Sequence, residues 1–341
     1  MRWLVERQRL ELIRPFTIAR GTSTYRETVR LELEHQGIVG YGEAAPNPRY
    51  QETVESAAAA LSQIPPGTVE LRPDTFRTFV ASHRPFFREQ HAAMAAFDMA
   101  VLDWTGKARS EPVFAMLGID PTPMPPTSFT VGIDSPEAMA ERARELAPHY
   151  RVLKIKLGTD HDRELITAVR NATPVPLRVD ANEGWESPER ALAEIEWLAE
   201  RGVEFVEQPL PASLDERMPW LKDRSPLPLL ADESACSQKD LARVACGFHG
   251  INVKLMKCGG ILSALDLVAA AREWGLSVMV GCMIESSCGL AAAAQVGPMS
   301  DFADLDSNLY LAADPFSGHP VIDGYVSLTS LPGLGTRPVA N

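Results

Sequence analysis

The chain has 341 residues, a length that favours two domains, although a single α/β barrel can use about 200–250 residues. It carries 33 Lys and Arg against 45 Asp and Glu, and the formal charge of −12 argues against a nucleic-acid-binding protein, which usually has a basic surface. Hydrophobic residues make up 45% and charged residues 23%, a composition that excludes an intrinsically disordered chain.

The N-terminal residues, MRWLVERQRLELIRP, are too charged to contain the apolar segment of a signal peptide. No stretch reaches the roughly 18 apolar residues that a membrane helix needs, because Glu285 interrupts the most apolar candidate. The five cysteines form no C-x-x-C motif, so a disulfide framework is not expected. We therefore expect a protein of the reducing cytoplasm with no membrane partner.

The first part of the chain reads as strands followed by helices. Residues 1–45 contain alternating apolar and polar side chains, which predict β-strands. Helical patterns follow over 52–63 and 73–82, and a longer apolar periodic segment covers 87–108. This order is typical of an α+β domain, which we place at residues 1–118.

The pattern changes at the Pro-rich hinge 120–127. Over 119–320, short apolar segments alternate with helical ones, which predicts a parallel sheet. Eight strands with seven helical connections are expected, the strands being 127–132, 151–158, 176–182, 204–210, 228–234, 250–257, 276–282 and 302–307. The last segment, 321–341, is expected to return to the first domain.

Polar residues end these apolar strands at a spacing of 22 to 27 residues: Lys156, Asp180, Glu207, Asp232, Lys257, Cys282 and Asp304. A near-constant step of one strand plus one helix indicates a βα repeat. Eight such strands close into a barrel, and their regularity fits a barrel better than an open doubly wound sheet. The predicted fold is α/β: a modified TIM barrel, (βα)7β, capped by the N-terminal α+β domain, with its chemistry at the carboxyl ends of the strands.

Three of these strand ends carry carboxylates, from Asp180, Glu207 and Asp232. Ligation by oxygen alone suits Mg²⁺, whereas zinc would favour His or Cys. The alternative is a carboxylate cluster that is paired with lysines and holds no metal. Because three adjacent carboxylates repel one another, we favour the metal site.

Lysines precede and follow the three carboxylates in the sequence. Lys154 and Lys156 lie two apart on one strand and therefore point to the same face. The barrel order places Lys156 and Lys257 on opposite walls, a geometry that removes a proton from one side of a carbon and returns it to the other. Lys154 is expected to support Lys156 by charge repulsion. Strict alternation puts Lys254 on the other face from Lys257, and it receives no role.

Two aspartates, Asp304 and Asp306, share a face of the last predicted strand. Taken alone, the D-x-D sequence favours a capping or turn pair. At a barrel mouth, two convergent carboxylates would instead favour a cationic ligand such as a free ammonium group.

Together these residues resemble the enolase superfamily, in its muconate-lactonizing-enzyme-like branch, and within it the dipeptide epimerases, especially those that act on L-Ala-D/L-Glu. The resemblance covers nearly the whole chain and rests on PFTIARGT, YGEAAPNPRY, KIKLG, VDANEGW, VEQPL, ADES, NVKLMKCGG and FADLD. The D-x-D sequence is the feature that resembles dipeptide epimerases within this branch.

The resemblance implies that Lys156 and Lys257 are the acid/base catalysts. It also implies one Mg²⁺ per subunit, held by the three carboxylates, and an α-ammonium group bound by the D-x-D pair. Loops near 15–25 and 47–50 would close over the mouth, with Arg20 meeting the side-chain carboxylate of a Glu residue. Two further residues in the segment of the seventh strand receive no role, Glu285 and Ser286.

Several alternatives stay open at this stage. Hydrophobic or cationic dipeptides are alternative substrates, and N-acylamino acid racemisation or o-succinylbenzoate synthesis would use the same lysines. Those last substrates lack the free ammonium that Asp304 and Asp306 would bind. A catalytically silent peptide-binding protein is the alternative outside enzymes, since a fold does not prove a function. The oligomeric state is undetermined, with a homo-oligomer as one option.

Overall fold

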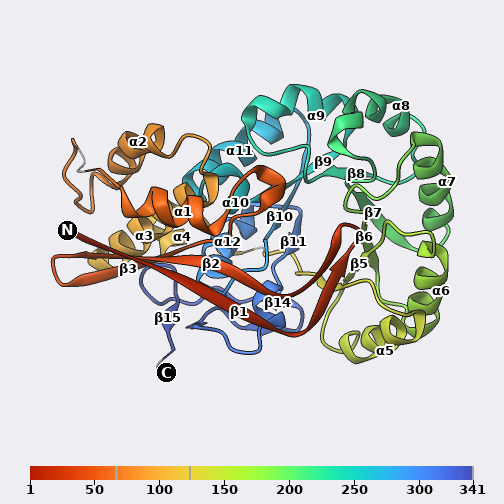
Figure 1. The fold of residues 1–341 in the computed structure, drawn as a ribbon, viewed down its shortest axis with the longest axis horizontal. Coiled ribbons are helices and arrows are strands. Elements are labelled where there is room, and N and C mark those ends of the chain that lie inside the picture. The colour runs from red at the N-terminus through yellow and green to blue at the C-terminus, as the bar shows by residue number, and fades with distance from the viewer. Residues whose placement is uncertain (66–67, 123, 340–341) are drawn as a thin grey trace.

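The structure is a computed structural model that describes residues 1–65, 68–122 and 124–339. Figure 1 shows an N-terminal antiparallel sheet with its helices beside a ring of strands and outer helices. Residue 123 of the predicted hinge and residues 340–341 of the predicted C-terminal segment lie outside the described residues.

The N-terminal sheet consists of three antiparallel strands in sequence order: β1 (Arg2–Ile18), β2 (Gly21–His35) and β3 (Ile38–Ala44). The alternation of side chains gives this sheet one buried face, on which Val29, Leu31 and Leu33 are fully buried. The long hairpin of β1 and β2 reaches across to the barrel, where Figure 1 shows its tip beside β5 and β6. The strands predicted within residues 1–45 are confirmed.

Three main helices cover the sheet: α1 (Val54–Ser62), α2 (Phe76–Phe87) and α3 (His91–Arg109). Helix α3 lies against β3 and is buried from residue 92 to residue 106. Its close approach requires glycine on the strand, because a Cβ built at Gly42 would lie 1.9 Å from the carbonyl oxygen of Ala96. The sheet and α3 therefore form a rigid cap core.

The second part is a parallel sheet of eight short strands. The strands are β4 (Phe129–Val131), β5 (Leu153–Lys156), β6 (Leu177–Asp180), β7 (Val203–Glu207), β8 (Leu229–Ala231), β9 (Gly250–Lys254), β10 (Ser277–Gly281) and β11 (Phe302–Asp304). They pair in sequence order, and a hydrogen bond of 3.0 Å from Ser128 N to Ala303 O joins the first strand region to the last. This closure confirms the barrel and excludes the open sheet.

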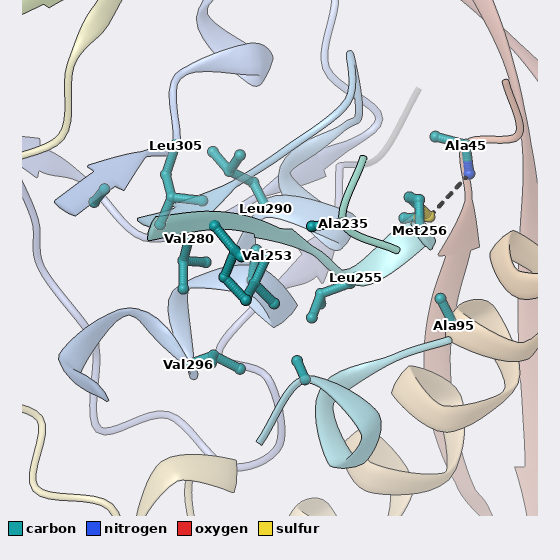
Figure 2. Packing of buried hydrophobic residues seen from close by; sticks show 14 of the residues in the cluster. Ala45, Ala95, Ala235, Val253, Leu255, Met256, Val280, Leu290, Val296 and Leu305 are labelled. Carbon is teal, nitrogen blue, oxygen red and sulfur yellow. Dashed lines mark hydrogen bonds between the residues drawn. The ribbon is translucent and has the colours of Figure 1, made fainter. Parts of the chain in front are cut away.

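Helices follow the first seven strands and connect them around the barrel. The connections contain α5 (Pro136–Leu146), α6 (Asp162–Ala172), α7 (Pro188–Ala199), α8 (Met218–Lys222), α9 (Leu241–Gly247), α10 (Leu255–Cys258) with α11 (Ile261–Glu273), and α12 (Ser287–Ala294). Several of these helices begin with a side-chain cap. At the start of α5 and of α7, Ser135 and Ser187 each accept a backbone N–H of the first turn, and a proline occupies the first helical position. Figure 2 shows Val253 and Val280 of two barrel strands packed in one cluster with Leu290 of α12.

The segment after the barrel runs back along the cap. Gly333 exchanges backbone hydrogen bonds with Val113, at 2.9 Å, and with Glu111, at 3.0 Å. Leu334 N donates to Asp103 of α3 at 2.9 Å. The exact divisions at residues 118 and 320 stay predictions. None of the described helices has the length and apolarity that crossing a bilayer would require.

Candidate active site

The three predicted carboxylates meet at one end of the barrel. Asp180 ends β6, Glu207 ends β7, and Asp232 directly follows β8. Asp180 and Glu207 are paired in register, so that their side chains leave the sheet at the same height. One oxygen of each carboxylate lies within 4.8 Å of the others, and all three residues are buried. Their buried strands therefore hold three carboxylates around one small space.

Lysines surround this acidic triad. Lys156 Nζ donates to Asp180 at 2.6 Å, and Lys257 Nζ donates to Asp232 at 2.7 Å. Burial raises the pKa of Asp180, but the charges of Lys156 and Lys154 outweigh it and hold the pKa well below its usual range. The ammonium groups thus compensate the carboxylates, and mutual repulsion alone does not require a metal ion.

The triad nevertheless fits a divalent cation. Glu207 Oε1 accepts a hydrogen bond of 2.8 Å from Asn252. Among the described residues, Glu207 Oε2 accepts no hydrogen bond and has an ionic contact of 2.7 Å with Lys154 Nζ. Burial and the neighbouring charge of Asp180 raise the pKa of Glu207. A buried carboxylate oxygen that accepts no hydrogen bond is costly. Oxygen ligands at three strand ends form the donor set that Mg²⁺ favours.

Lys156 and Lys257 lie on opposite sides of the triad. Lys156 ends β5, and three strands separate β5 from β9, the strand that precedes Lys257. The prediction that Lys257 itself ends a strand is wrong, because β9 stops at Lys254 and Lys257 lies within the short helix α10. The regular spacing of strand ends could not reveal this single extra helical turn.

The position of Lys254 also differs from the prediction. Its Nζ donates to Asp232 at 2.7 Å, and its side chain lines the same cavity as Lys156. Lys257 is only 2% exposed, and it donates to Asp232 and to the carbonyl oxygen of Asn252. Alternation failed here because it holds along a strand, whereas a helix separates Lys254 from Lys257. Lys254, which ends β9, therefore faces the cavity opposite Lys156, whereas Lys257 is not among the described residues that line it. The lysine that the sequence interpretation left without a role thus has the position that it gave to Lys257.

Lys154 is buried among three carboxylates. Its Nζ lies 2.8 Å from Asp304, 2.7 Å from Glu207 and 3.1 Å from Asp180. Burial alone would lower the pKa of Lys154, but these negative charges raise it well above its usual value. Lys154 is therefore a fixed positive charge that links the triad to Asp304. Its predicted support of Lys156 stays a prediction.

The two aspartates of the D-x-D sequence, Asp304 and Asp306, have different hydrogen-bond partners. Asp304 accepts hydrogen bonds from Lys154 at 2.8 Å and Ser128 at 2.6 Å. Asp306 accepts from the backbone of Thr130 at 2.6 Å and from the Tyr310 hydroxyl at 3.0 Å. Burial and the charge of Asp304 raise the pKa of Asp306 to about 6. Both carboxylates line the cavity beside the lysines.

The cavity has a volume of about 180 Å³ and lies between the barrel mouth and the cap. Both predicted lid loops contribute to it. From the cap, its lining includes Phe16, Ile18, Arg20, Arg26, Pro48 and Tyr50, and from the barrel it includes Lys154, Lys156, Asp232, Lys254, Asp304 and Asp306. The sequence signals thus identify the polar base of the cavity and the two lid loops, whereas further lining residues such as Arg26 and Tyr310 required the structure.

Both lid loops bind one barrel carboxylate, that of Glu183. Arg20 from the hairpin tip donates to Glu183 at 3.1 Å, and Arg49 from η1 (Pro48–Tyr50) donates to it at 2.8 and 2.7 Å. Glu183 has a φ of 68°, which is uncommon for a residue other than glycine. Arg20 also pairs with Glu233 at 2.7 Å. The predicted substrate contact of Arg20 therefore involves a side chain that already has two carboxylate partners.

We expect Glu183→Gln to raise KM about 5- to 30-fold with a smaller effect on kcat, because each lid loop loses a charged hydrogen bond worth about 1–2 kcal/mol. Steady-state kinetics with the substrate on which the protein is most active would measure the change. Glu189→Gln, at an exposed ion pair on α7, is the control and should leave KM unchanged. Equal KM values for Glu183→Gln and the unmodified protein would show that Glu183 does not hold the lids closed.

Comparisons with protein families agree with this architecture. Residues 3–118 match the "Mandelate racemase / muconate lactonizing enzyme, N-terminal domain", and residues 138–340 match the "Enolase C-terminal domain-like" family. The chain belongs to this family of capped barrels, as its motifs predict.

Individual relatives are epimerases and racemases. The chain is 40% identical over 335 residues to the L-Ala-D/L-Glu epimerase of Bacteroides thetaiotaomicron, covering 97% of this chain and 86% of that protein. It resembles the dipeptide epimerase of Enterococcus faecalis V583, complexed with Mg and L-Leu-L-Tyr, with a TM-score of 0.89, 31% identity and 98% coverage of both chains. The N-succinyl Arg/Lys racemase of Bacillus cereus gives a TM-score of 0.92 at 28% identity, over 99% of this chain and 96% of that one.

Proposed function

We propose that the chain catalyses 1,1-proton transfer at the α-carbon of the C-terminal residue of a dipeptide, with L-Ala-D/L-Glu as the preferred substrate. The observation that carries this proposal is that Lys156 and Lys254, at the ends of β5 and β9, line one cavity from opposite sides of the acidic triad. The names of the relatives support the same reaction.

In the proposed reaction the substrate carboxylate lies at the triad, and one lysine faces each side of the α-carbon. One lysine removes the α-proton as a general base, and the opposite lysine donates a proton to the other face. Asp180, Glu207 and Asp232 would hold Mg²⁺, which as a Lewis acid stabilises negative charge on the substrate carboxylate. Lys154 adds a fixed positive charge beside the triad. Asp304 and Asp306 would receive the α-ammonium of the N-terminal residue, and closure of the cap excludes water.

A dipeptide library incubated with the protein and Mg²⁺ in D₂O tests the proposal. The expected result is a mass increase of one deuterium at the α-carbon, largest for L-Ala-L-Glu. Exchange only with N-succinyl amino acids would support the racemase alternative, and exchange mainly with apolar dipeptides would support a hydrophobic dipeptide epimerase. A protein that only binds peptides would produce no exchange. We also propose a cytoplasmic location, consistent with five free cysteines.

The preference for an acidic side chain is supported by Arg26. Within the described residues Arg26 forms no ion pair, and its only side-chain hydrogen bond goes to Ser23 at 2.5 Å. It lines the cavity, and its cross-strand neighbour Leu10 packs toward the barrel loops near Tyr310. Desolvation by burial lowers the pKa of Arg26. An anionic substrate side chain would supply the missing partner, in addition to the contact predicted for Arg20.

We expect Arg26→Gln to lower kcat/KM for L-Ala-L-Glu about tenfold to a hundredfold, because a partly buried charged hydrogen bond contributes about 1.5–3 kcal/mol. The value for L-Ala-L-Leu should change little. Arg9→Gln, at an exposed position of the same hairpin, is the control for general damage to the cap. An equal loss of kcat/KM for the two dipeptides would show that Arg26 does not recognise the side chain of the C-terminal residue.

A further inference from the structure

Lys257 is a buried lysine whose ammonium group is fully occupied by the protein. It is 2% exposed, and it is not among the described residues that line the cavity. Its Nζ donates to the main-chain oxygen of Asp232 at 2.6 Å, to Asp232 Oδ1 at 2.7 Å and to the main-chain oxygen of Asn252 at 2.9 Å. An ammonium group has three N–H donors, so these bonds use all of them. Lys257 therefore keeps no N–H for a substrate, and its partners indicate what it does.

Two of the three bonds go to one residue of the acidic triad, Asp232. Because Lys257 Nζ binds both the main-chain oxygen and the carboxylate of Asp232, it fixes the direction of that carboxylate relative to the end of β8. The other carboxylate oxygen, Oδ2, accepts a hydrogen bond of 2.7 Å from Lys254, which lines the cavity. Lys254 already gives Asp232 a positive partner, so charge compensation alone does not explain a second lysine.

The third bond leads to another carboxylate of the triad. Asn252 lies on β9, is fully buried, and its side-chain amide donates to Glu207 Oε1 at 2.8 Å. A Cβ built at Gly281 of the neighbouring β10 would lie 2.5 Å from Asn252 Oδ1, so the amide is closely packed against that strand. Lys257 thus connects Asp232 with the residue that orients Glu207.

The helix that carries Lys257 is anchored on both sides. Leu255 packs in the hydrophobic cluster of Figure 2, and Met256 Sδ accepts the backbone N–H of Ala45 of the cap at 3.3 Å, the dashed contact in that figure. Helix α10 ends at Gly259, whose φ of 90° a side chain would disfavour. The backbone of Lys257 therefore provides a fixed support for its ammonium group.

We propose that Lys257 is a positioning residue that holds Asp232 directly, and Glu207 through Asn252, in the arrangement that binds the divalent cation. This assignment deepens the proposed function and rests on its metal site. Hydrogen-bond partners behind metal ligands orient them, and their loss typically costs about 10–100-fold in metal affinity. The ammonium charge of Lys257 repels a cation, so its charge weakens metal binding whereas its hydrogen bonds strengthen it. The sign of the change in Mg²⁺ affinity separates these two effects.

Isothermal titration calorimetry of the full chain with Mg²⁺ alone provides the test. For Lys257→Met, which has no charge and no N–H donor, we expect the Kd for Mg²⁺ to rise about tenfold to a hundredfold. Lys254→Met removes a charge from the same carboxylate but leaves the bonds of Lys257, and its Kd should stay the same or fall. Lys257→Gln is uncharged and keeps an amide donor, so its Kd should also rise, and it decides the question if Lys257→Met does not fold. A loss of folded protein would lower the number of sites in the titration and leave the Kd of each site unchanged.

Lys107→Met is the matched control, because Lys107 of α3 also binds one carboxylate and one main-chain oxygen, those of Asp103 and Val39. It should lower thermal stability and leave the Kd for Mg²⁺ unchanged. The assignment of Lys257 is wrong if its folded variants bind Mg²⁺ as tightly as the unmodified protein or more tightly, or if Lys254→Met weakens binding equally. An unmodified protein that binds no Mg²⁺ would refute the metal site, and one that binds Mg²⁺ but exchanges no dipeptide would refute the proposed function. Both of those results differ from a failure of the assignment of Lys257.

Discussion

Replacing either Lys156 or Lys254 with alanine should abolish epimerisation and leave one-sided proton exchange. Each lysine serves one face of the α-carbon, so a variant that keeps one lysine can still remove and return a proton on that face. General acid/base catalysis by one side chain is worth about 10²–10⁴-fold, and we expect epimerisation to fall by at least about 10³-fold. Nuclear magnetic resonance in D₂O would measure the rate of epimerisation and the rate of α-proton exchange for each epimer.

Folding should survive both substitutions. Asp180 keeps an ionic contact with Lys154 when Lys156 is removed, and Asp232 keeps Lys257 when Lys254 is removed. Lys239→Ala, at an exposed position, is the control and should keep full activity. Substantial epimerisation by either active-site variant would refute the two-lysine scheme.

Removing the carboxylate of Glu207 should have the second large effect. Glu207→Gln keeps an acceptor for Asn252 but removes one of the three negative charges of the triad. We expect epimerisation to fall by more than about a hundredfold, since even residues behind metal ligands cost about 10–100-fold. We also expect the variant to lose stabilisation by Mg²⁺, which for the unmodified protein amounts to about 2.7 kcal/mol at a hundred times Kd. Thermal unfolding with and without Mg²⁺ measures this without reference to activity.

Glu204→Gln is the matched control for this measurement. Glu204 lies on the same strand, but its side chain is 40% exposed and pairs with Arg178 near the start of the strands, at the opposite end from the triad. It should keep both the Mg²⁺ response and the activity. The metal site would be contradicted if Mg²⁺ did not change the unfolding temperature of the unmodified protein. It would also be contradicted if Mg²⁺ stabilised the Glu207→Gln variant as strongly as the unmodified protein.

The barrel and its acidic triad could be predicted because their signals are local and repeat along the chain. Each buried strand gives an apolar run, and a carboxylate at the end of such a run has few structural explanations. The steps from Asp180 to Glu207 and from Glu207 to Asp232 therefore indicated both the repeat and the convergence that the structure shows. Register follows from the parallel pairing once the strands are known.

The residues that sequence reasoning misplaced depend on contacts between distant segments. Lys257 leaves the strand pattern because the chain forms one helical turn after β9, and cap residue Asp98 accepts the backbone N–H of Ile261 just beyond that turn. Arg20 was predicted to meet a substrate carboxylate, whereas its partners Glu183 and Glu233, which come from two different barrel loops, were not predicted. No local pattern reports such pairs, because they arise only when the cap and barrel are placed together.

The most direct test of the central claim is the position of deuterium early in the reaction. The unmodified protein is incubated with L-Ala-L-Glu and Mg²⁺ in D₂O, and both epimers are isolated within the first few per cent of turnover. Two opposed lysines predict that newly formed L-Ala-D-Glu carries solvent deuterium at its α-carbon. An epimerised product that retains the substrate's own α-proton would show that a single base acts on both faces and would contradict the account.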